Sequence, residues 1–262
     1  MTSFALKIIA IIAMTIDHFI FTVGQSGLIE FFHMSNHASY IIIEIMSGIG
    51  RMAFPLFAFM IAEGCHKTGN IRKYAGRLAI FALISEPFFY FATHYKLSVT
   101  FKDFLVNLSE FHFENIFFTL AVSVIAIYVY QLLKAKLPDK AKYLFLPLML
   151  VAAFIAQYFD MDYDMWGVIL IMALYTCKSR KATVIVILLW SVCVYGIQGL
   201  VGTEFAWPQI QNVLSLTAGA ALSCLPIWFY NGKRGRKSKW FFYIYYPAHL
   251  FLYTIIGMIA LA

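Results

Sequence analysis

The sequence predicts an all-α membrane protein, a polytopic bundle of transmembrane helices, from three observations. Of its 262 residues, 62% are hydrophobic and only 13% are charged, whereas about a quarter of the residues in a soluble domain are charged. Apolar stretches of roughly 20 residues, the length that a helix needs to cross a bilayer, recur along the whole chain. These stretches do not alternate apolar and polar residues, as the strands of a membrane barrel do. We therefore expect a single integral-membrane domain over residues 1–262.

The apolar stretches define about nine expected spans. In chain order they are 4–24, 40–65, 76–93, 115–133, 143–159, 165–177, 182–200, 211–230 and 240–261. The sixth is the shortest and has the weakest signal. The long loop 94–114 is amphipathic and aromatic, a composition that favours a short helix lying on the membrane surface.

The positive charges of the chain are concentrated in alternate loops. Most of the 20 lysines and arginines lie in the loops that follow the second, fourth, sixth and eighth spans, while the intervening loops are mainly acidic. Because basic loops stay on the cytoplasmic side, this pattern predicts a cytoplasmic N-terminus, an outer C-terminus and a multi-pass protein of the bacterial inner (cytoplasmic) membrane. Basic loops beside anionic lipid explain the net charge of +7, so we expect a lipid bilayer and no nucleic acid as partner.

Ionisable side chains interrupt the apolar spans, where they are costly and usually functional. Lys7 and His18 are eleven residues apart, so they share one helix face and lie about 16 Å apart along its axis. Helix rise also brings His18, Arg51, Glu86 and His249 to a similar depth. The full set comprises Lys7, Asp17, His18, Glu44, Arg51, Glu63, Glu86 and His249.

Proline occurs close to three of these polar positions. Pro55, Pro87 and Pro247 lie within four residues of an ionisable side chain in three different spans. Proline removes a backbone hydrogen bond and kinks a membrane helix, often where the helix lines a cavity. The coincidence favours a polar cavity in the bundle over ordinary packing.

No pattern in the chain predicts a metal site. The Asp160-x-Asp162-x-Asp164 sequence resembles the start of a calcium loop but lacks its glycine and its final glutamate. His33 and His37 have no third ligand in their loop. The four cysteines are isolated and read as small apolar residues.

A set of short motifs occurs in a fixed order along nearly the whole chain. They are 6–10 leading to Asp17-His18, 50–64, Tyr74 to Leu78, 85–88, Asn115 with Thr119, Asp162-Tyr163 with Gly167, 230–235, and Tyr246-Pro247 with His249-Leu250. As an ordered set they resemble the F-pilin acetylase (TraX-like) family. One position departs from the family pattern, since Asp164 stands where an Asp-Tyr-Gly run would have glycine.

The resemblance implies an N- or O-acetyltransferase embedded in the membrane. Its donor would be the CoA thioester acetyl-CoA, used as a co-substrate from the cytoplasm. Its acceptor would be an extracytoplasmic amine or hydroxyl, on a pilin-like N-terminus or a surface glycan. The first span is also similar, more distantly, to the type-three membrane acyltransferases, which carry a basic residue, ten intervening residues and a histidine; Lys7 and His18 have this spacing.

Acetyl transfer requires a base, an oxyanion donor and a site for the CoA phosphates. His18 is the candidate base; Arg51, Asn115 or His249 is the candidate oxyanion donor; and Glu86 or Glu63 is expected to orient His18 or to pair with Arg51. Because neighbours on a helix point about 100° apart, Asp17 is expected to face another helix. The candidate catalytic residues are therefore His18, Asp17, Arg51, Glu86 and His249, and the candidate CoA-binding residues are Lys7, Arg72, Lys73, Arg77, Glu63 and Asn115.

Two other classes of protein remain open. Carboxylates, histidines and broken helices near the membrane midplane also suit a transporter or proton-coupled carrier, although the chain has no visible repeat. A scaffold or assembly protein would use the same polar residues only to hold helices together. Stabilisation of the purified protein by acetyl-CoA separates these classes, because only the acyltransferase predicts it.

Overall fold

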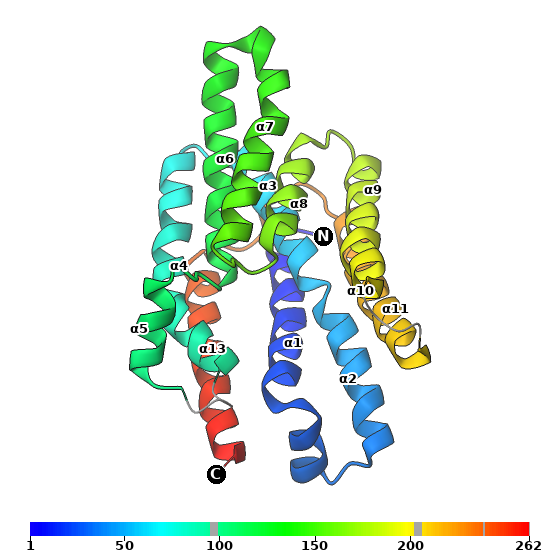
Figure 1. Cartoon of the computed structure of the whole chain (residues 1–262). Coiled ribbons are helices and arrows are strands. Elements are labelled where there is room, and N and C mark those ends of the chain that lie inside the picture. Colours follow the sequence, from blue (N-terminus) through cyan, green and yellow to red (C-terminus); the bar gives the residue numbers. More distant parts are fainter. Residues whose placement is uncertain (95–98, 202–205, 238, 262) are drawn as a thin grey trace. The chain divides into compact units, whose positions relative to one another are not determined.

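The computed structural model describes residues 1–94, 99–201, 206–237 and 239–261, which form helices and no strands (Figure 1). The helices divide into two compact units. Unit 1 comprises Met1–Phe57 and Lys178–Ala262, and unit 2 comprises Ala58–Cys177. Each unit is described by itself, and the single domain over residues 1–262 stays a prediction.

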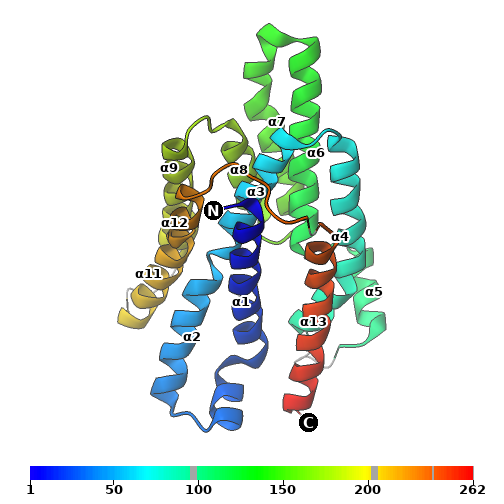
Figure 2. The same cartoon turned by 180° about the vertical axis from the view of Figure 1, so that it is seen from behind.

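Unit 1 is built around the first helix, α1, which packs against both α2 and the last helix, α13 (Figure 2). Helix α11 packs on the other side of α2 and also contacts α9. The elements of unit 1 are α1 (Ser3–Phe32), α2 (Asn36–Gly50), α9 (Arg180–Ser191), a π-helical segment (Val192–Ile197), α10 (Gln198–Leu200), α11 (Trp207–Leu222), α12 (Cys224–Trp228) and α13 (Lys239–Leu261).

Unit 2 is built around α6, which contacts α4, α7 and α8. Helices α6 and α7 form an antiparallel hairpin, drawn in green in Figure 1. The elements of unit 2 are α4 (Ile71–His94), α5 (Phe101–Ser109), α6 (Ile116–Lys136), α7 (Pro138–Tyr158) and α8 (Asp164–Thr176), while α3 (Ala53–Lys67) carries the chain from unit 1 into unit 2.

Seven helical segments of the described chain are long and apolar enough to cross a membrane. Two further predicted spans are also helical: 165–177 corresponds to the 13-residue α8, and 240–261 corresponds to α13. The seven segments are Ser3–Thr22, Asn36–Lys67, Ile71–His94, Ile116–Lys136, Pro138–Tyr158, Arg180–Leu200 and Trp207–Trp228.

The second predicted span, 40–65, is interrupted in its middle. Helix α2 ends at Gly50 and α3 begins at Ala53, so Arg51 and Met52 lie between two helices. Pro55 accounts for the break, because it has no N–H to donate to the Arg51 carbonyl four residues earlier. The break places Arg51 at a helix end inside an apolar segment.

The predicted short helix in loop 94–114 is present as α5. Its first turn is held by a capping box, in which Thr100 accepts from the Asp103 N–H and the Asp103 carboxylate accepts from the Thr100 N–H at 2.7 Å. These hydrogen bonds hold the pKa of Asp103 below its usual value. The location of α5 on the membrane surface stays a prediction.

Two glycines allow α2 and α11 to pack closely in unit 1. A Cβ on Gly219 would collide with the backbone carbonyl of Gly48, and a Cβ on Gly48 would lie 2.8 Å from Ser215 Oγ. Small residues are the usual means of bringing two membrane helices into contact. The glycine pair therefore fixes the position of α2, which ends at Gly50, directly before Arg51.

Replacing Gly219 with alanine is expected to lower the free energy of unfolding by about 1–3 kcal/mol, because the Cβ forces α2 and α11 apart. Gly76→Ala is the matched control, since a Cβ at Gly76 meets nothing within 4 Å and alanine is the better helix former. Thermal unfolding in detergent measures both variants. Equal midpoints for Gly219→Ala and wild type would contradict the close contact.

Candidate functional site

The centre of the candidate site is a pair of histidines in unit 1, one on α1 and one on α13. The Nδ1 atom of His18 lies 2.7 Å from the Nε2 atom of His249. The two rings are parallel within 3° and their centroids are 4.9 Å apart, so the two nitrogens face each other. His249 is buried, whereas His18 is partly exposed. The structure thus brings together two residues that are 231 positions apart in the chain.

The second ring nitrogen of His249 is also engaged. Its Nδ1 atom lies 2.9 Å from the backbone carbonyl oxygen of Tyr245, one turn earlier on α13. The His18 Nε2 atom, by contrast, has no hydrogen-bond partner within the described ranges. His18 therefore presents one nitrogen to His249 and leaves the other for a further ligand.

Three tyrosines of α13 surround the His249 ring. The Tyr245 ring stacks on it with centroids 5.1 Å apart, and Tyr246 and Tyr253 contact it edge-on at 5.5 and 5.8 Å. Tyr253 donates to the Thr15 carbonyl at 3.0 Å, and the Tyr245 and Thr15 hydroxyls are 2.6 Å apart. These hydrogen bonds to α1 hold α13 in register beside His18.

Asp17 points away from the histidine pair, toward α2. Its carboxylate Oδ1 forms an ion pair with Arg51 Nη2 at 3.0 Å. The same carboxylate packs against Gly50, where a Cβ would occupy the space of the Asp17 side chain. The expectation that Asp17 faces another helix is confirmed. Arg51 thus has a carboxylate partner on α1 that the sequence did not indicate, and the predicted pairing of Arg51 with Glu86 or Glu63 stays a prediction.

Lys7 lies on α1 close to a basic loop that closes over the start of the helix. The N–H groups of Ser3 and Phe4 donate to the carbonyls of Lys233 and Arg234 at 2.9 and 3.1 Å. The Lys7 ammonium lies 5.0 Å from the Phe242 ring centroid.

Lys7 and Arg234 carry like charges, and neither has a carboxylate partner in the described part of the chain. Gly235 allows the loop to close over the start of α1, because its φ of +73° suits glycine and a Cβ there would touch Thr2. The loop thus brings the Lys233–Arg234 backbone to the first turn of the helix that carries Lys7.

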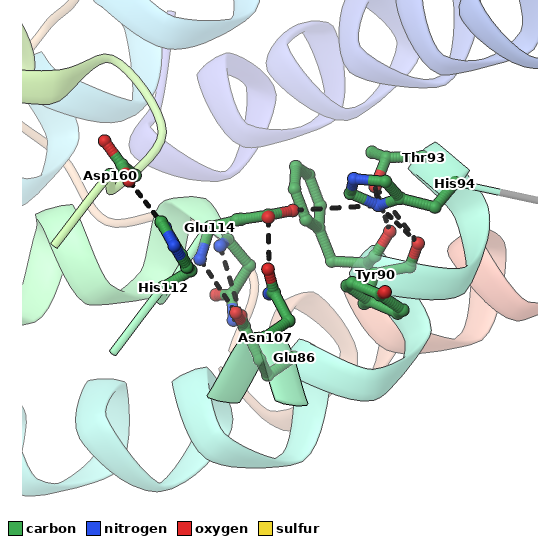
Figure 3. Close-up of polar contacts among 10 residues, drawn as sticks. Glu86, Tyr90, Thr93, His94, Asn107, His112, Glu114 and Asp160 are labelled. Atoms are coloured by element: carbon green, nitrogen blue, oxygen red, sulfur yellow. Dashed lines mark hydrogen bonds and ion pairs between the residues drawn. The ribbon is translucent and has the colours of Figure 1, made fainter. Parts of the chain in front are cut away.

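The predicted residues Glu86 and Asn115 lie together in unit 2 and are both buried. The Glu86 carboxylate accepts from the N–H groups of Glu114 and Asn115 at 2.7 and 3.2 Å, and from the Asn115 side-chain amide (Figure 3). Asn115 itself caps α6, since its side-chain oxygen accepts from the Phe117 N–H at 3.0 Å. These contacts give both residues a structural role at the start of α6, and their predicted roles in catalysis and CoA binding stay predictions.

A polar cluster continues from Glu114 across one end of unit 2 (Figure 3). Asn107 donates to the Glu114 carboxylate at 3.3 Å, and His94 lies 3.9 Å from its other oxygen. His112 Nδ1 lies 2.5 Å from Asp160. The contacts tie the segment after α5 to α4 and to the loop before α8. Within the described residues, no group of three or more His, Cys, Asp or Glu is placed to hold a metal ion.

The other predicted CoA-binding residues also belong to unit 2. Arg72 donates to the Tyr128 hydroxyl, Arg77 lies over the Tyr74 ring at 5.8 Å, and Lys73 is exposed. Glu63 forms an ion pair with Lys67 at 2.6 Å, one turn later on α3. These residues lie in unit 2 and Lys7 lies in unit 1, so a CoA site shared by Lys7 and these residues stays a prediction.

Glu44 occupies a groove between α2 and α11 in unit 1. Its carboxylate accepts from the Tyr40 hydroxyl at 2.8 Å, and the groove has a volume of about 290 Å³. The groove is lined by Tyr40, Ile43, Glu44, Ser47, Pro208, Gln209 and Asn212. The Tyr40 hydroxyl and the side chains of Gln209 and Asn212 thus line the same groove as the Glu44 carboxylate.

Sequence reasoning missed the tyrosines around His249 and the contact of the Arg234 backbone with the start of α1. Tyr245 and Tyr253 lie four residues before and after His249, which is the spacing of neighbours on one helix face. Arg234 lies in the segment 230–235, which carries part of the family resemblance. The helical spacing and the motif were therefore the available signals.

Taken together, several apolar helices and an ionisable cluster between α1 and α13 indicate a helical membrane protein with a polar site in its interior. The family model described as "TraX protein" matches residues 3–257. The chain belongs to the TraX family.

A relative with a name connected to fimbriae also matches nearly the whole chain. The "Probable fimbrial assembly protein FimC, serogroup H1" of Dichelobacter nodosus is 29% identical over 263 aligned positions, which cover 96% of this chain and 93% of that protein. No solved structure matches the chain.

Proposed function

We propose that the protein is a membrane-embedded acetyltransferase that moves an acetyl group from acetyl-CoA to an amine or hydroxyl on the outer side of the membrane. The observation that carries the proposal is the His18–His249 pair on α1 and α13. In this pair the Nε2 atom of His18 has no hydrogen-bond partner among the described residues. Membership of the TraX family and a relative named for fimbrial assembly support a pilin-like or other surface acceptor.

The proposed topology has nine spans in the bacterial inner membrane, with the N-terminus in the cytoplasm and the C-terminus outside. The seven long apolar segments, together with α8 and α13, supply nine helical segments in the predicted order. The alternation of basic and acidic loops supports this orientation. It would place the loop around Arg234 at the cytoplasmic face, where acetyl-CoA is available.

The CoA phosphates would bind at Lys7 and Arg234. The loop that carries Arg234 is hydrogen-bonded to the start of α1, and neither Arg234 nor Lys7 has a carboxylate partner in the described structure. Such cations suit a phosphate, which accepts charge-assisted hydrogen bonds. Lys7 precedes His18 on α1 by eleven residues, or about 16 Å of helix rise. An extended pantetheine arm would follow this face of α1 from Lys7 toward His18.

In the proposed reaction, His18 removes a proton from the acceptor as its nitrogen or oxygen bonds to the thioester carbonyl carbon. The carbon–sulfur bond then breaks, and the CoA thiolate leaves with a proton returned from His18. Arg51 is the oxyanion donor that the proposal retains, since both ring nitrogens of His249 and the Asn115 amide already have partners, whereas a guanidinium has five N–H donors and the Asp17 ion pair engages Nη2. Its partner Asp17 is the chain neighbour of His18.

Acetyl-CoA is expected to raise the unfolding temperature of the purified protein in detergent. A ligand present at 100 times its dissociation constant stabilises by about 2.7 kcal/mol. Replacing Lys7 or Arg234 with alanine should weaken acetyl-CoA binding about 10- to 100-fold, the effect of losing one charged hydrogen bond. Lys140→Ala, at an exposed lysine of unit 2, is the control and should bind like wild type.

Acetyl-pantetheine, which lacks the nucleotide phosphates, makes this test specific. The Lys7 and Arg234 variants should bind it as wild type does. Absence of any acetyl-CoA stabilisation, together with absence of acetyl transfer, would favour the transporter or scaffold and overturn the proposal.

A further inference from the structure

The two histidines form a hydrogen-bonded chain whose protons are fixed at one end. That end is the Tyr245 carbonyl oxygen, 2.9 Å from His249 Nδ1. A carbonyl oxygen only accepts, so His249 Nδ1 must carry the hydrogen. A neutral imidazole has a single N–H, and His249 Nε2 is therefore left with its lone pair.

The lone pair of His249 Nε2 in turn determines the hydrogen on His18. His18 Nδ1 lies 2.7 Å from this nitrogen, and a hydrogen bond at that distance needs one donor and one acceptor. Because His249 Nε2 accepts, His18 Nδ1 donates. His18 Nε2 then has the free lone pair, and it is the nitrogen without a partner in the described residues.

We propose that His249 is a positioning residue that holds His18 in its Nδ1–H tautomer, so that Nε2 is the atom that takes the acceptor's proton. This inference rests on the proposed function in so far as His18 is the base. It assigns His249 a different role from the oxyanion donor expected from sequence. A histidine whose other nitrogen is fixed by a second group is a recurring way to set which nitrogen reacts.

The surroundings of His249 keep this chain in one orientation. A turn of the His249 ring would break the hydrogen bonds to Tyr245 and His18, and the rings of Tyr245, Tyr246 and Tyr253 pack around it. Tyr253 and Tyr245 also bond to Thr15, three residues before His18 on α1. The same contacts that dock α13 on α1 therefore align the two imidazoles.

The chain also determines where the transferred proton goes. When Nε2 takes the proton, His18 becomes an imidazolium whose Nδ1–H still donates to His249 Nε2, which stabilises the positive charge. The Tyr245 carbonyl cannot accept a proton in turn, so no proton leaves through His249. The proton stays on His18 until the CoA thiolate accepts it.

Nitrogen-15 NMR of the full-length protein, labelled at histidine, tests the tautomer directly. His18 is assigned by the signal lost in His18→Asn. In wild type at neutral pH we expect a protonated Nδ1 and an unprotonated Nε2 on His18. A wild-type spectrum with the proton on Nε2 of His18 overturns the inference, whatever the activity.

Two variants of His249 extend the test. His249→Phe keeps the ring shape without an acceptor, so His18 should lose its tautomer preference and the rate of acetyl transfer should fall on the order of 100-fold. His249→Gln places an amide oxygen near the former Nε2 and should restore both the tautomer and most of the activity. Leu252→Ala, at an exposed leucine of α13, is the control, and the His18 signal should not change.

The two proposals fail in distinguishable ways. Acetyl transfer by wild type with the unpredicted tautomer overturns the role of His249 and leaves the proposed function standing. The expected tautomer without acetyl-CoA binding or transfer supports the histidine chain and overturns the acetyltransferase. A His249→Phe variant with an unchanged His18 signal and full activity also overturns the positioning role.

Discussion

Replacing His18 with alanine is expected to lower acetyl transfer by roughly 10²- to 10⁴-fold, the contribution of a positioned general base. The variant loses the only nitrogen of the histidine pair that is free of a partner in the described residues, so the acceptor keeps its proton and attacks poorly. Radiolabelled acetyl-CoA added to membranes of producing cells measures the rate as label fixed to protein, glycan or lipid.

Two controls separate a catalytic effect from a loss of fold. His18→Ala should still be stabilised by acetyl-CoA, because its phosphates are expected to bind about 16 Å away at Lys7. His37→Ala, at an exposed histidine near the start of α2, should retain wild-type activity. Full activity in His18→Ala at normal protein abundance would rule out this histidine as the base.

The second large effect is expected at Glu86, through stability. Glu86→Leu leaves the Glu114 N–H, the Asn115 N–H and the Asn115 amide without their buried acceptor. Each unsatisfied buried donor costs about 1–3 kcal/mol, so the free energy of unfolding should fall by about 3 kcal/mol or more. Thermal unfolding in detergent, with size-exclusion chromatography to detect aggregation, measures the change.

Glu63→Gln is the matched control, because Glu63 forms a more exposed i,i+4 ion pair with Lys67 that contributes at most about 1 kcal/mol. Comparing Glu86→Gln with Glu86→Leu tests the catalytic prediction for this residue. A stable Glu86→Gln protein without acetyl transfer would assign Glu86 to catalysis. An unfolding midpoint of Glu86→Leu equal to wild type would contradict the structural role.

The helices of this protein could be predicted from local sequence because each is an apolar segment long enough to cross a bilayer. A kink was expected beside Pro55, which cannot donate a backbone hydrogen bond, although span 40–65 was predicted as one helix and is interrupted at Arg51–Met52. Lys7 and His18 could be placed on one face of α1 by helical geometry alone. In all three cases the relevant residues are close together in the chain.

The contacts between helices could not be predicted in the same way. Matching the depths of His18 and His249 indicated that both reach one layer, but many residues share a depth and only a few touch. Asp17 and Arg51 show the difference. Sequence reasoning named no partner for Asp17, and for Arg51 it proposed Glu86 or Glu63. Which acid faces Arg51 depends on how α1 and α2 are rotated, and the close packing at Gly50 sets that rotation.

The sequence by itself determined that this is a helical TraX-family protein with ionisable side chains in apolar segments, because hydrophobic length, charge placement and motif order are properties of the linear chain. Only the tertiary structure decided that His18 meets His249, that Asp17 meets Arg51 and that the Arg234 backbone bonds to the start of α1. Each pairing joins separate helices or loops, so it depends on side-chain direction and helix rotation, which no local pattern specifies.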